Sequence, residues 1–498
     1  MEAYRQETIL AAVALYMLFC VATGIWAMRR TSNSSDFFIA GRGLGPIVVS
    51  LALFSSTLSG FGFVGGPGLV YSIGGSSFWM ITISTAGYAL GFFMVAKRIR
   101  MIAGVRNCIS LPDIVAVRYG SDIVRMLVAI TIVLGVMGYL ATQILAMAVV
   151  MQAILSGTTM FANIGLVACV AISSAVLIFY CVTGGIIASV YTDVVQGGIM
   201  MAAGILILLT AMSVFDGGMT EATSVILRDD SEAIMPWGSA GIMASLGWFF
   251  VFGLGVAGQP HLVTKMMMNR KISDNRHIFP MSVLGYVLAA LLWVSIGVIM
   301  RATVIEGIIP PLTAPDDAAS VFLSLFTSPL LAGVVFAGLF AAIMSTSDAF
   351  LNIGTAAIIH DIPKAIRGKA IAAELLWARI VTVLLAVVAA LFALYSYYAD
   401  ATLVALLGAF GWATFAASLF PVVALGLNWK GATVPGAVAA IVSALLINFG
   451  VQLTGIALPY GISGGLLSFV VSLVLFLGVS SITSPPKLDH DIQRVMDI

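Results

Sequence analysis

Apolar runs of about twenty residues follow one another along almost the whole chain, and this pattern constrains the fold more than any other feature. A run of that length spans the ~30 Å hydrocarbon core of a bilayer as a helix. Only 9% of the 498 residues are charged, against roughly a quarter in soluble domains. The chain is therefore predicted to be an all-α polytopic membrane protein, with one transmembrane domain over 1–482 and a short cytoplasmic tail over 483–498.

Thirteen transmembrane helices are predicted from the positions where the apolar runs begin and end. Arg29 and Arg30 follow the first run instead of preceding it, which favours an uncleaved helix over a signal peptide. The predicted spans are 8–28, 46–72, 77–96, 124–155, 161–182, 190–213, 238–260, 279–300, 327–357, 373–396, 401–426, 433–453 and 463–481.

The positions of lysine and arginine predict the orientation. If the loop after the first span is cytoplasmic, all of the 23 Lys and Arg residues except Arg5, Arg228 and Arg301 fall inside, Lys265 among them. Cytoplasmic loops carry such an excess of positive charge. We therefore expect a multi-pass protein of the inner (plasma) membrane, with its N-terminus outside and its C-terminus in the cytoplasm.

Two apolar runs are rich in glycine and proline and are predicted to be interrupted helices. They contain SSTLSGFGFVGGPG at 55–68 and GLGVAGQPH at 253–261. Irregular backbone at membrane depth is tolerated only inside protein or beside a cavity, and a pair of such runs points to a transporter site. Since they lie five spans apart, they predict a five-plus-five inverted repeat over about 46–213 and 238–426, with extra helices at both ends. Close packing through small residues is the alternative.

The ninth run carries hydroxyl groups on one helical face. Ala342, Ser345 and Thr346 have the spacing i, i+3, i+4, so they share a face. Two hydroxyls and a loosened carbonyl suit a small hard cation, by analogy with other hard cations. Carbonyls of Ser55 and Leu58 in the second run could complete the set. The alternative is that the hydroxyls only bond to their own helix.

Other polar side chains inside the apolar runs are functional candidates. Asp193 and Asp348 are the acids, because a buried carboxylate is costly; helix capping and structural pairing are the respective alternatives. Tyr139 and Gln143, at i and i+4, could face a substrate or bond to a neighbouring helix. His261 is assigned a structural role.

Several classes of function find no support in the sequence. Four cysteines, with no CxxC pair, predict neither a disulfide framework nor a metal site other than one for sodium. No nucleophile, base and acid form a recognisable set, so no enzyme is predicted. The net charge of +1 gives no indication of nucleic-acid binding.

Five motifs together resemble the sodium:solute symporter family, which contains carriers of proline, pantothenate, acetate and glucose. The resemblance covers about 36–361 and implies a LeuT-type core with alternating access and sodium as the coupling ion. A functional monomer is expected, although the sequence leaves the oligomeric state open. The motifs are DFFIAGRGLGP at 36–46, SSTLSGFGFVGGPG at 55–68, GGIIASVYTDVVQ at 184–196, GLGVAGQPH at 253–261 and AAIMSTSDAFLN at 341–352.

The resemblance also implies roles for single residues. Asp193 matches the family acid associated with the inward sodium path or a second sodium site, and Asp348 stands where some relatives have a serine linked to an extra sodium. Arg42 matches a loop arginine. The implied sodium site is made by the carbonyls of Ser55, Leu58 and Ala342 and the hydroxyls of Ser345 and Thr346, the positions that the spacing also indicates.

The chain departs from the family pattern where the solute would bind. Proline carriers have an aspartate in place of Thr57 and a tryptophan in place of Phe252, and sugar carriers have polar groups in place of Phe61 and Gly62. Neither proline nor a sugar therefore follows. Substrate-binding candidates near the midplane are Thr57, Gly60, Phe61, Tyr139, Gln143, Phe252, Val256 and Gln259.

The function predicted from the sequence is sodium-coupled import of a small organic solute, with an amino acid or organic carboxylate favoured. The predicted partners are the solute, the sodium ion and the lipid bilayer. Two alternatives stay open: proton coupling through Asp193 or Asp348 in the same fold, and a transporter-like solute sensor.

Overall fold

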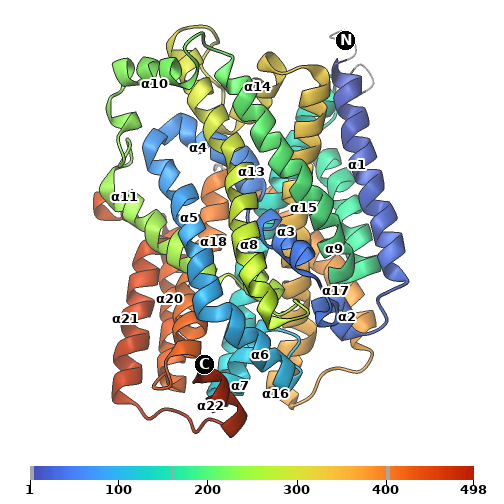
Figure 1. Ribbon diagram of the computed structural model, residues 1–498, viewed down its shortest axis with the longest axis vertical. Helices are drawn as coiled ribbons and strands as arrows, with labels where there is room; N and C mark the ends of the chain where they lie inside the picture. The colour runs from blue at the N-terminus through green and yellow to red at the C-terminus, as the bar shows by residue number, and fades with distance from the viewer. Residues whose placement is uncertain (1–4, 159–160, 400–403, 498) are drawn as a thin grey trace.

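The computed structural model describes residues 5–158, 161–399 and 404–497, and these are helical along most of their length (Figure 1). Long helices run side by side along the long axis of the molecule. The longest are α1 (Arg5–Met28), α8 (Asp122–Ser156), α9 (Leu166–Met212), α13 (Asn275–Ile305), α15 (Pro329–Ala356), α17 (Glu374–Ala399), α18 (Val404–Leu419), α20 (Val434–Thr454) and α21 (Gly464–Ile482).

Within the described residues, eleven helical segments are long and apolar enough to cross a membrane. Two of them, Gly62–Arg106 with 45 residues and Leu166–Met212 with 47, would each be about 70 Å long if straight, about twice the ~30 Å hydrocarbon core. The first contains the end of the second predicted span and all of the third, and α9 contains most of the fifth and sixth. The number of thirteen crossings stays a prediction.

Helix α9 is broken at Gly185, which has φ +53° and ψ −144°. Left-handed φ values cost little for glycine, which has no Cβ. A Cβ at this position would also lie 2.5 Å from the ring of Phe37 on α2 (Ser34–Ile39). The break separates 166–184 from 186–212, close to the predicted boundary between the fifth and sixth spans.

The second predicted span is interrupted, as its glycines and proline predict. Helix α3 (Pro46–Ser55) begins at a proline in its first turn, where the missing N–H costs nothing. It ends before four irregular residues, 56–59. A π-helical turn (Phe61–Gly65) and α4 (Gly66–Ile73) then complete the span.

The seventh predicted span is also broken. Helix α11 (Gly241–Trp248) is followed by a π-helical turn (Phe249–Gly253) and a 3-10 turn (Leu254–Gly258). After Gln259, which is extended, α12 (Pro260–Lys265) begins. The interruption of both runs is confirmed, whereas the inverted repeat stays a prediction.

Burial separates central from peripheral helices. In the segment Pro329–Arg367, which contains α15, 83% of the most apolar window is buried, against 28% for α1 and 28% for Glu374–Tyr398 in α17. Helices α20 and α21 pack against each other at the edge of the molecule (Figure 1). Only the segment Gly408–Asn428, at 89%, is more buried among the eleven, so the polar side chains of α15 predicted to bind ions lie in the enclosed centre of the bundle.

Short helices gather at the two ends of the molecule (Figure 1). At one end lie α6 (Lys97–Arg106), α7 (Leu111–Tyr119), α16 (Ile362–Arg367) and α22 (His490–Met496). At the other lie α10 (Gly218–Asp229) and α14 (Ala318–Phe326). The remaining helices are α5 (Phe78–Leu90), which continues through a π-helical turn into α6, and α19 (Gly426–Asn428).

The polar tail is folded against the bundle. Ile492 and Val495 of α22 are buried, and Arg106 on α6 contacts Asp491 at 2.7 Å and Asp489 at 2.5 Å. All four cysteines, Cys20, Cys108, Cys169 and Cys181, are buried and free.

Candidate functional site

The hydroxyl groups of α15 meet the end of α3 where the second span breaks. Ser345 Oγ donates to Ser55 Oγ at 2.9 Å, and Ser56 Oγ lies 3.2 Å from both the Oγ and the carbonyl of Ser345. Thr346 Oγ1 lies 3.1 Å from the carbonyls of Ser56 and Ala342. These residues form what we call the α3–α15 site.

The α3–α15 site contains four of the five residues that the spacing predicts for sodium. Ser55, Ala342, Ser345 and Thr346 lie together and are fully buried. Leu58 lies in the same break, where its N–H donates to the Phe54 carbonyl at 3.2 Å. Ser56 is an additional member that the spacing argument did not select. Clustered hydroxyl and carbonyl oxygens are the ligands that hard cations prefer.

The side chain of Lys265, the last residue of α12, reaches the same site. Its Nζ donates to the Ala52 carbonyl at 3.0 Å, to Asp193 Oδ2 at 2.8 Å and to Ser56 Oγ. Only 1% of the Lys265 side chain and none of the Asp193 side chain is exposed. The expectation that Lys265 lies in a cytoplasmic loop was wrong, because the seventh span continues as α12 and ends with this buried side chain.

The position of α12 follows from its two ends. Pro260 starts the helix in its first turn, directly after the extended Gln259. Past the other end, Arg270 N donates to the Leu44 carbonyl at 2.8 Å and Leu44 N to the Met268 carbonyl at 3.2 Å. The loop of the GRGLGP motif therefore fixes the chain that follows Lys265. Arg42, in that loop, donates to the Cys108 carbonyl at 3.1 Å.

Asp348 forms a second buried polar group one helical turn beyond Ser345. Its two carboxylate oxygens accept hydrogen bonds from Tyr180 Oη at 2.8 Å and Ser189 Oγ at 2.7 Å. Both donors are on α9, and Ser189 lies one turn before Asp193. Helix α9 therefore joins Asp193 and Asp348. Capping does not explain Asp193, because it lies inside the second part of α9 and is fully buried.

Tyr139 and Gln143 on α8 contact the break that follows α3. Tyr139 Oη lies 2.9 Å from Ser59 Oγ, and Gln143 Oε1 accepts from Gly60 N at 2.7 Å. Both residues thus make helix-to-helix hydrogen bonds, the second of the two predicted roles. Gln143 Nε2 is buried and has no hydrogen-bond partner among the described residues, so its two N–H donors stay available.

Aromatic rings surround this region. Phe252 stacks on Trp412 with centroids 5.4 Å apart, Tyr139 lies 4.6 Å from Phe350, and His261 lies 4.5 Å from Phe350. These five residues are called the aromatic group below. Sequence reasoning missed Phe350 and Trp412, because a single ring in an apolar helix looks the same whether it faces lipid or the centre of the bundle.

The other substrate-binding candidates have different surroundings. Gln259 Nε2 donates to the Trp412 carbonyl at 3.1 Å, while Gln259 Oε1 has no partner in the described part of the chain. Thr57 is bonded to Tyr88 on α5 and to the Leu53 carbonyl. Val256 packs against α5 at Gly87. The side chain of Phe61 lies outside what the structure describes.

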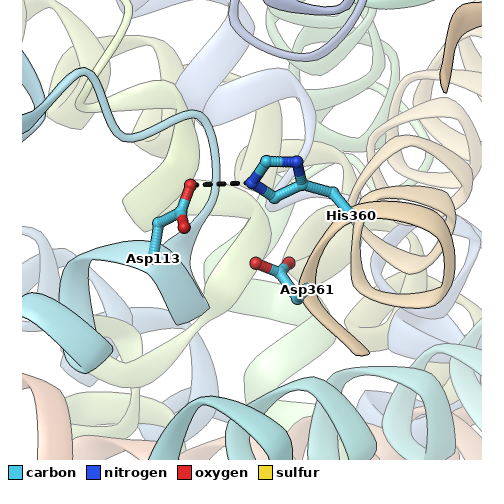
Figure 2. Close-up of side chains that lie close together, drawn as sticks. All are labelled: Asp113, His360 and Asp361. Carbon is cyan, nitrogen blue, oxygen red and sulfur yellow. Dashed lines mark hydrogen bonds and ion pairs between the residues drawn. The ribbon is translucent and has the colours of Figure 1, made fainter. Parts of the chain in front are cut away.

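A cluster of acids and a histidine lies apart from these sites, near the end that carries α7 and α16. Ligand atoms of Asp113, His360 and Asp361 all lie within 4.8 Å of one another, and Figure 2 shows the 2.9 Å contact between His360 Nε2 and Asp113. Asp113 also pairs with Arg125 and, at 2.7 Å, with Lys364. Because three basic groups already surround Asp113, the cluster fits an ion-pair network better than a metal site.

The electrostatics of Asp113 support this interpretation. Burial raises the pKa of the Asp113 carboxyl, but the hydrogen bonds and charges of His360 and Lys364 outweigh burial and hold that pKa well below its usual range. The network joins α7, α16 and the start of α17, where Glu374 contacts His360 at 2.6 Å. It is a structural tie between helix ends.

The fold and the sequence both have known relatives. The structure matches a Na+-coupled sialic acid symporter with a TM-score of 0.79 at 17% identity, covering 97% of this chain and 99% of that one. It also matches a nucleobase-cation-symport-1 family transporter with a TM-score of 0.53 at 16% identity, covering 94% and 99%. Identities this low show the fold alone.

Sequence comparison adds the family. The chain is 27% identical over 509 residues to the osmoregulated proline transporter of Bacillus subtilis (strain 168), covering 98% of each. It is 28% identical over 512 residues to the sodium/proline symporter of Staphylococcus aureus (strain JH9), covering 98% of this chain and 95% of that one. These relatives are membrane transporters and not enzymes. The family model for the sodium:solute symporter family matches residues 37–443, and the chain belongs to that family.

Proposed function

We propose that this protein carries a small organic solute into the cell by alternating access, coupled to the entry of sodium at the α3–α15 site. The observation that carries the proposal is the meeting of the Ser55, Ser345 and Thr346 hydroxyls at the break of the second span. Membership in the sodium:solute symporter family supports sodium-coupled symport. The shared fold with a Na+-coupled symporter supports a transport cycle of the same kind.

The proposed sodium ligands are the carbonyls of Ser55, Leu58 and Ala342 and the hydroxyls of Ser345 and Thr346. The C-terminal end of a helix carries a partial negative charge that favours cations, and α3 ends at this site. Sodium bound here would add a charged contact between two helices that also meet through hydrogen bonds. An inward membrane potential contributes about 2.3 kcal/mol per charge for each 100 mV.

The proposed solute site lies on the neighbouring surface of α8, around the aromatic group. Gln143 Nε2 offers a donor and Gln259 Oε1 offers an acceptor, and both atoms are buried without partners in the described residues. A buried polar atom left unpaired costs about 1–3 kcal/mol, which a polar solute would recover. An acceptor and a donor on a small apolar frame fit an amino acid or organic carboxylate.

The relatives suggest proline as one solute to test, since proline appears in the names of both. Thr57 and Phe252 differ from the proline-carrier pattern, however. The Thr57 hydroxyl is already bonded to Tyr88 and to the Leu53 carbonyl of α3, so it is poorly placed to serve a charged solute amine. We therefore propose a solute of this chemical class without restricting it to proline.

Asp348 and Asp193 are proposed as a second cation site or ion path. The carboxylate of Asp348 accepts from two neutral hydroxyls, those of Tyr180 and Ser189, and Asp193 pairs with Lys265. A carboxylate held by neutral donors can exchange its charge for a proton at lower cost than one held by a cation. Proton coupling through Asp348 is the second candidate.

We also propose that the end carrying α6, α7, α16 and α22 faces the cytoplasm. That end holds basic residues of α6 and α16, including Lys97, Arg106 and Lys364, as the positive-inside rule favours. The N-terminus would then lie outside and the C-terminus inside. The protein is proposed to act as a monomer with one transmembrane domain over 1–482.

The deciding experiment measures solute-induced thermal stabilisation of the purified protein, with amino acids, short-chain carboxylates, pantothenate and sugars tested in sodium and in potassium. Stabilisation that appears only in sodium would support coupling and identify the solute class. Equal stabilisation in both salts would argue for proton coupling, which proteoliposome uptake collapsed by a protonophore would establish. Binding of a solute that proteoliposomes never accumulate would point to a sensor.

A further inference from the structure

Lys265 brings a fixed positive charge into the site proposed for a positive ion. Its ammonium contacts the Ala52 carbonyl in the last turn of α3 and the hydroxyl of Ser56. Ser56 Oγ in turn lies 3.2 Å from Ser345 Oγ. One hydroxyl oxygen therefore separates the Lys265 ammonium from a proposed sodium ligand.

The ammonium has the surroundings that a small cation needs. It is bound by a helix-end carbonyl, a hydroxyl and a carboxylate, from α3 and α9, and only 1% of the side chain is exposed. Burying a charge without a partner costs many kcal/mol, so these contacts are what keeps Lys265 inside. Three oxygen contacts to one ammonium resemble a partial coordination shell.

We propose that the Lys265 ammonium competes with sodium. It occupies the end of α3 when no sodium is bound, and it has to leave the Ala52 carbonyl and the Ser56 hydroxyl before sodium binds. The inference rests on the proposed sodium site, which it deepens by naming the group that regulates its occupancy. Sodium and the ammonium exchange places, so no covalent step is involved.

Electrostatic repulsion prevents sodium and the Lys265 ammonium from occupying the end of α3 at the same time. Two unit charges about 5 Å apart repel by roughly 3 kcal/mol at an effective dielectric constant of 20. Asp193 supplies one negative charge, which the ammonium already neutralises at 2.8 Å. A second cation in the same space would therefore be uncompensated unless Lys265 moves.

A purely structural ion pair is the competing explanation. A buried pair of this kind needs both partners, and removing one partner leaves an unpaired charge that destabilises the fold. That explanation predicts lower stability for each single variant and no gain in sodium affinity. Competition predicts a gain.

The test measures the sodium concentration that half-saturates thermal stabilisation, in choline-balanced buffer, for a set of variants. Lys265→Met removes the competing charge and leaves Asp193 to attract sodium, so its sodium affinity should rise about tenfold or more. The double variant Lys265→Met/Asp193→Asn leaves no unpaired charge and should bind sodium more tightly than Asp193→Asn alone. Lys369→Met, in an exposed loop, is the matched control and should bind as the wild type does.

The test compares Lys265→Met with the wild type, and the double variant with Asp193→Asn. Either comparison decides the question if the other variant does not fold. Unchanged or weaker sodium affinity in both comparisons would overturn the inference. Adding Ser345→Ala to Lys265→Met should reverse the gain, since both changes act at one site. A wild type that ignores sodium, beside a Lys265→Met variant that binds it, would support competition and overturn sodium coupling in the native chain.

Discussion

Replacement of Ser345 by alanine tests the α3–α15 site most directly. The substitution removes one oxygen and leaves the backbone of α15 intact. Ser345 Oγ contacts Ser55 Oγ at 2.9 Å and Ser56 Oγ at 3.2 Å, so the oxygen faces α3 and not its own helix. A bound sodium ion would lose one of its ligands.

The expected size of the effect follows from the strength of one charged contact. A hydrogen bond or similar contact to a charged group contributes about 1.5–3 kcal/mol. Each 1.4 kcal/mol is tenfold in affinity, so sodium affinity should fall roughly ten- to one-hundred-fold. Loss of the two neutral hydroxyl contacts should lower the free energy of unfolding by only about 1–2 kcal/mol.

Ser347 provides the matched control on the same helix. It is also fully buried, but its Oγ donates to the Ile343 carbonyl of α15 itself at 2.7 Å. Ser347→Ala should therefore leave sodium affinity within twofold of the wild type, about 0.4 kcal/mol. Sodium-dependent thermal stabilisation and sodium-dependent uptake in proteoliposomes both measure the difference.

Two results would refute the reasoning. If Ser345→Ala keeps wild-type sodium affinity, the hydroxyl is not a ligand and the site lies elsewhere. If Ser345→Ala and Ser347→Ala weaken sodium binding equally, the effect comes from a general disturbance of α15.

Three further changes have defined outcomes. Asp348→Asn keeps one acceptor for Tyr180 or Ser189, so the fold should lose only about 1 kcal/mol; sodium dependence should change if Asp348 is in the ion path, as uptake at varied sodium would reveal. Gln143→Leu leaves Gly60 N without its acceptor and should cost about 1–3 kcal/mol of stability as well as solute affinity, measured by melting with and without solute. Asp113→Asn breaks a buried network and should cost about 3–5 kcal/mol; because the folded pKa of Asp113 is depressed, that stabilisation is present at neutral pH and lost only below about pH 4, where a pH series of melting temperatures should show the decline.

The polar face of α15 was predictable from spacing, because a regular helix fixes which residues share a face. Ser345 and Thr346 are adjacent to Ala342 on that face, and the irregular backbone at 56–59 follows from the glycines and serines around it. Asp193 and Asp348 were found by a different argument, the cost of a carboxylate inside an apolar run. In each case the local sequence determines the geometry.

Lys265 could not be placed in the same way. A lysine five residues after Pro260 reads as the first charge of a cytoplasmic loop, since burial of its ammonium depends on partners from two distant helices. The carbonyl of Ala52 and the carboxylate of Asp193 lie 213 and 72 residues away along the chain. One clue was available: α12 has no acidic residue of its own to pair with this lysine.

Phe350 and Trp412, two of the five members of the aromatic group, escaped prediction for a related reason. Trp412 lies in a helix whose sequence is nearly all apolar, so no periodicity separates an inward ring from a lipid-facing one. Phe350 lies on α15 among apolar and polar neighbours, and its residue type alone does not indicate a role. The number of membrane crossings was difficult to predict for another reason. The break in α9 depends on one glycine, Gly185, and the number of crossings depends on whether the chain reverses its direction at such a break.

The burial of all four native cysteines makes the chain a ready background for chemical labelling. Reaction with a maleimide needs an accessible thiolate; Cys108, the cysteine outside the long apolar segments, has its pKa raised to about 12 by burial and by the nearby Asp113. Single cysteines introduced at the exposed Thr223 on α10 and Arg367 on α16 would therefore be the reactive positions, one at each end of the molecule. A membrane-impermeant reagent added to intact cells should label the cysteine at position 223 and not the one at position 367. The labelling would then report which end faces the medium, without replacement of any native cysteine.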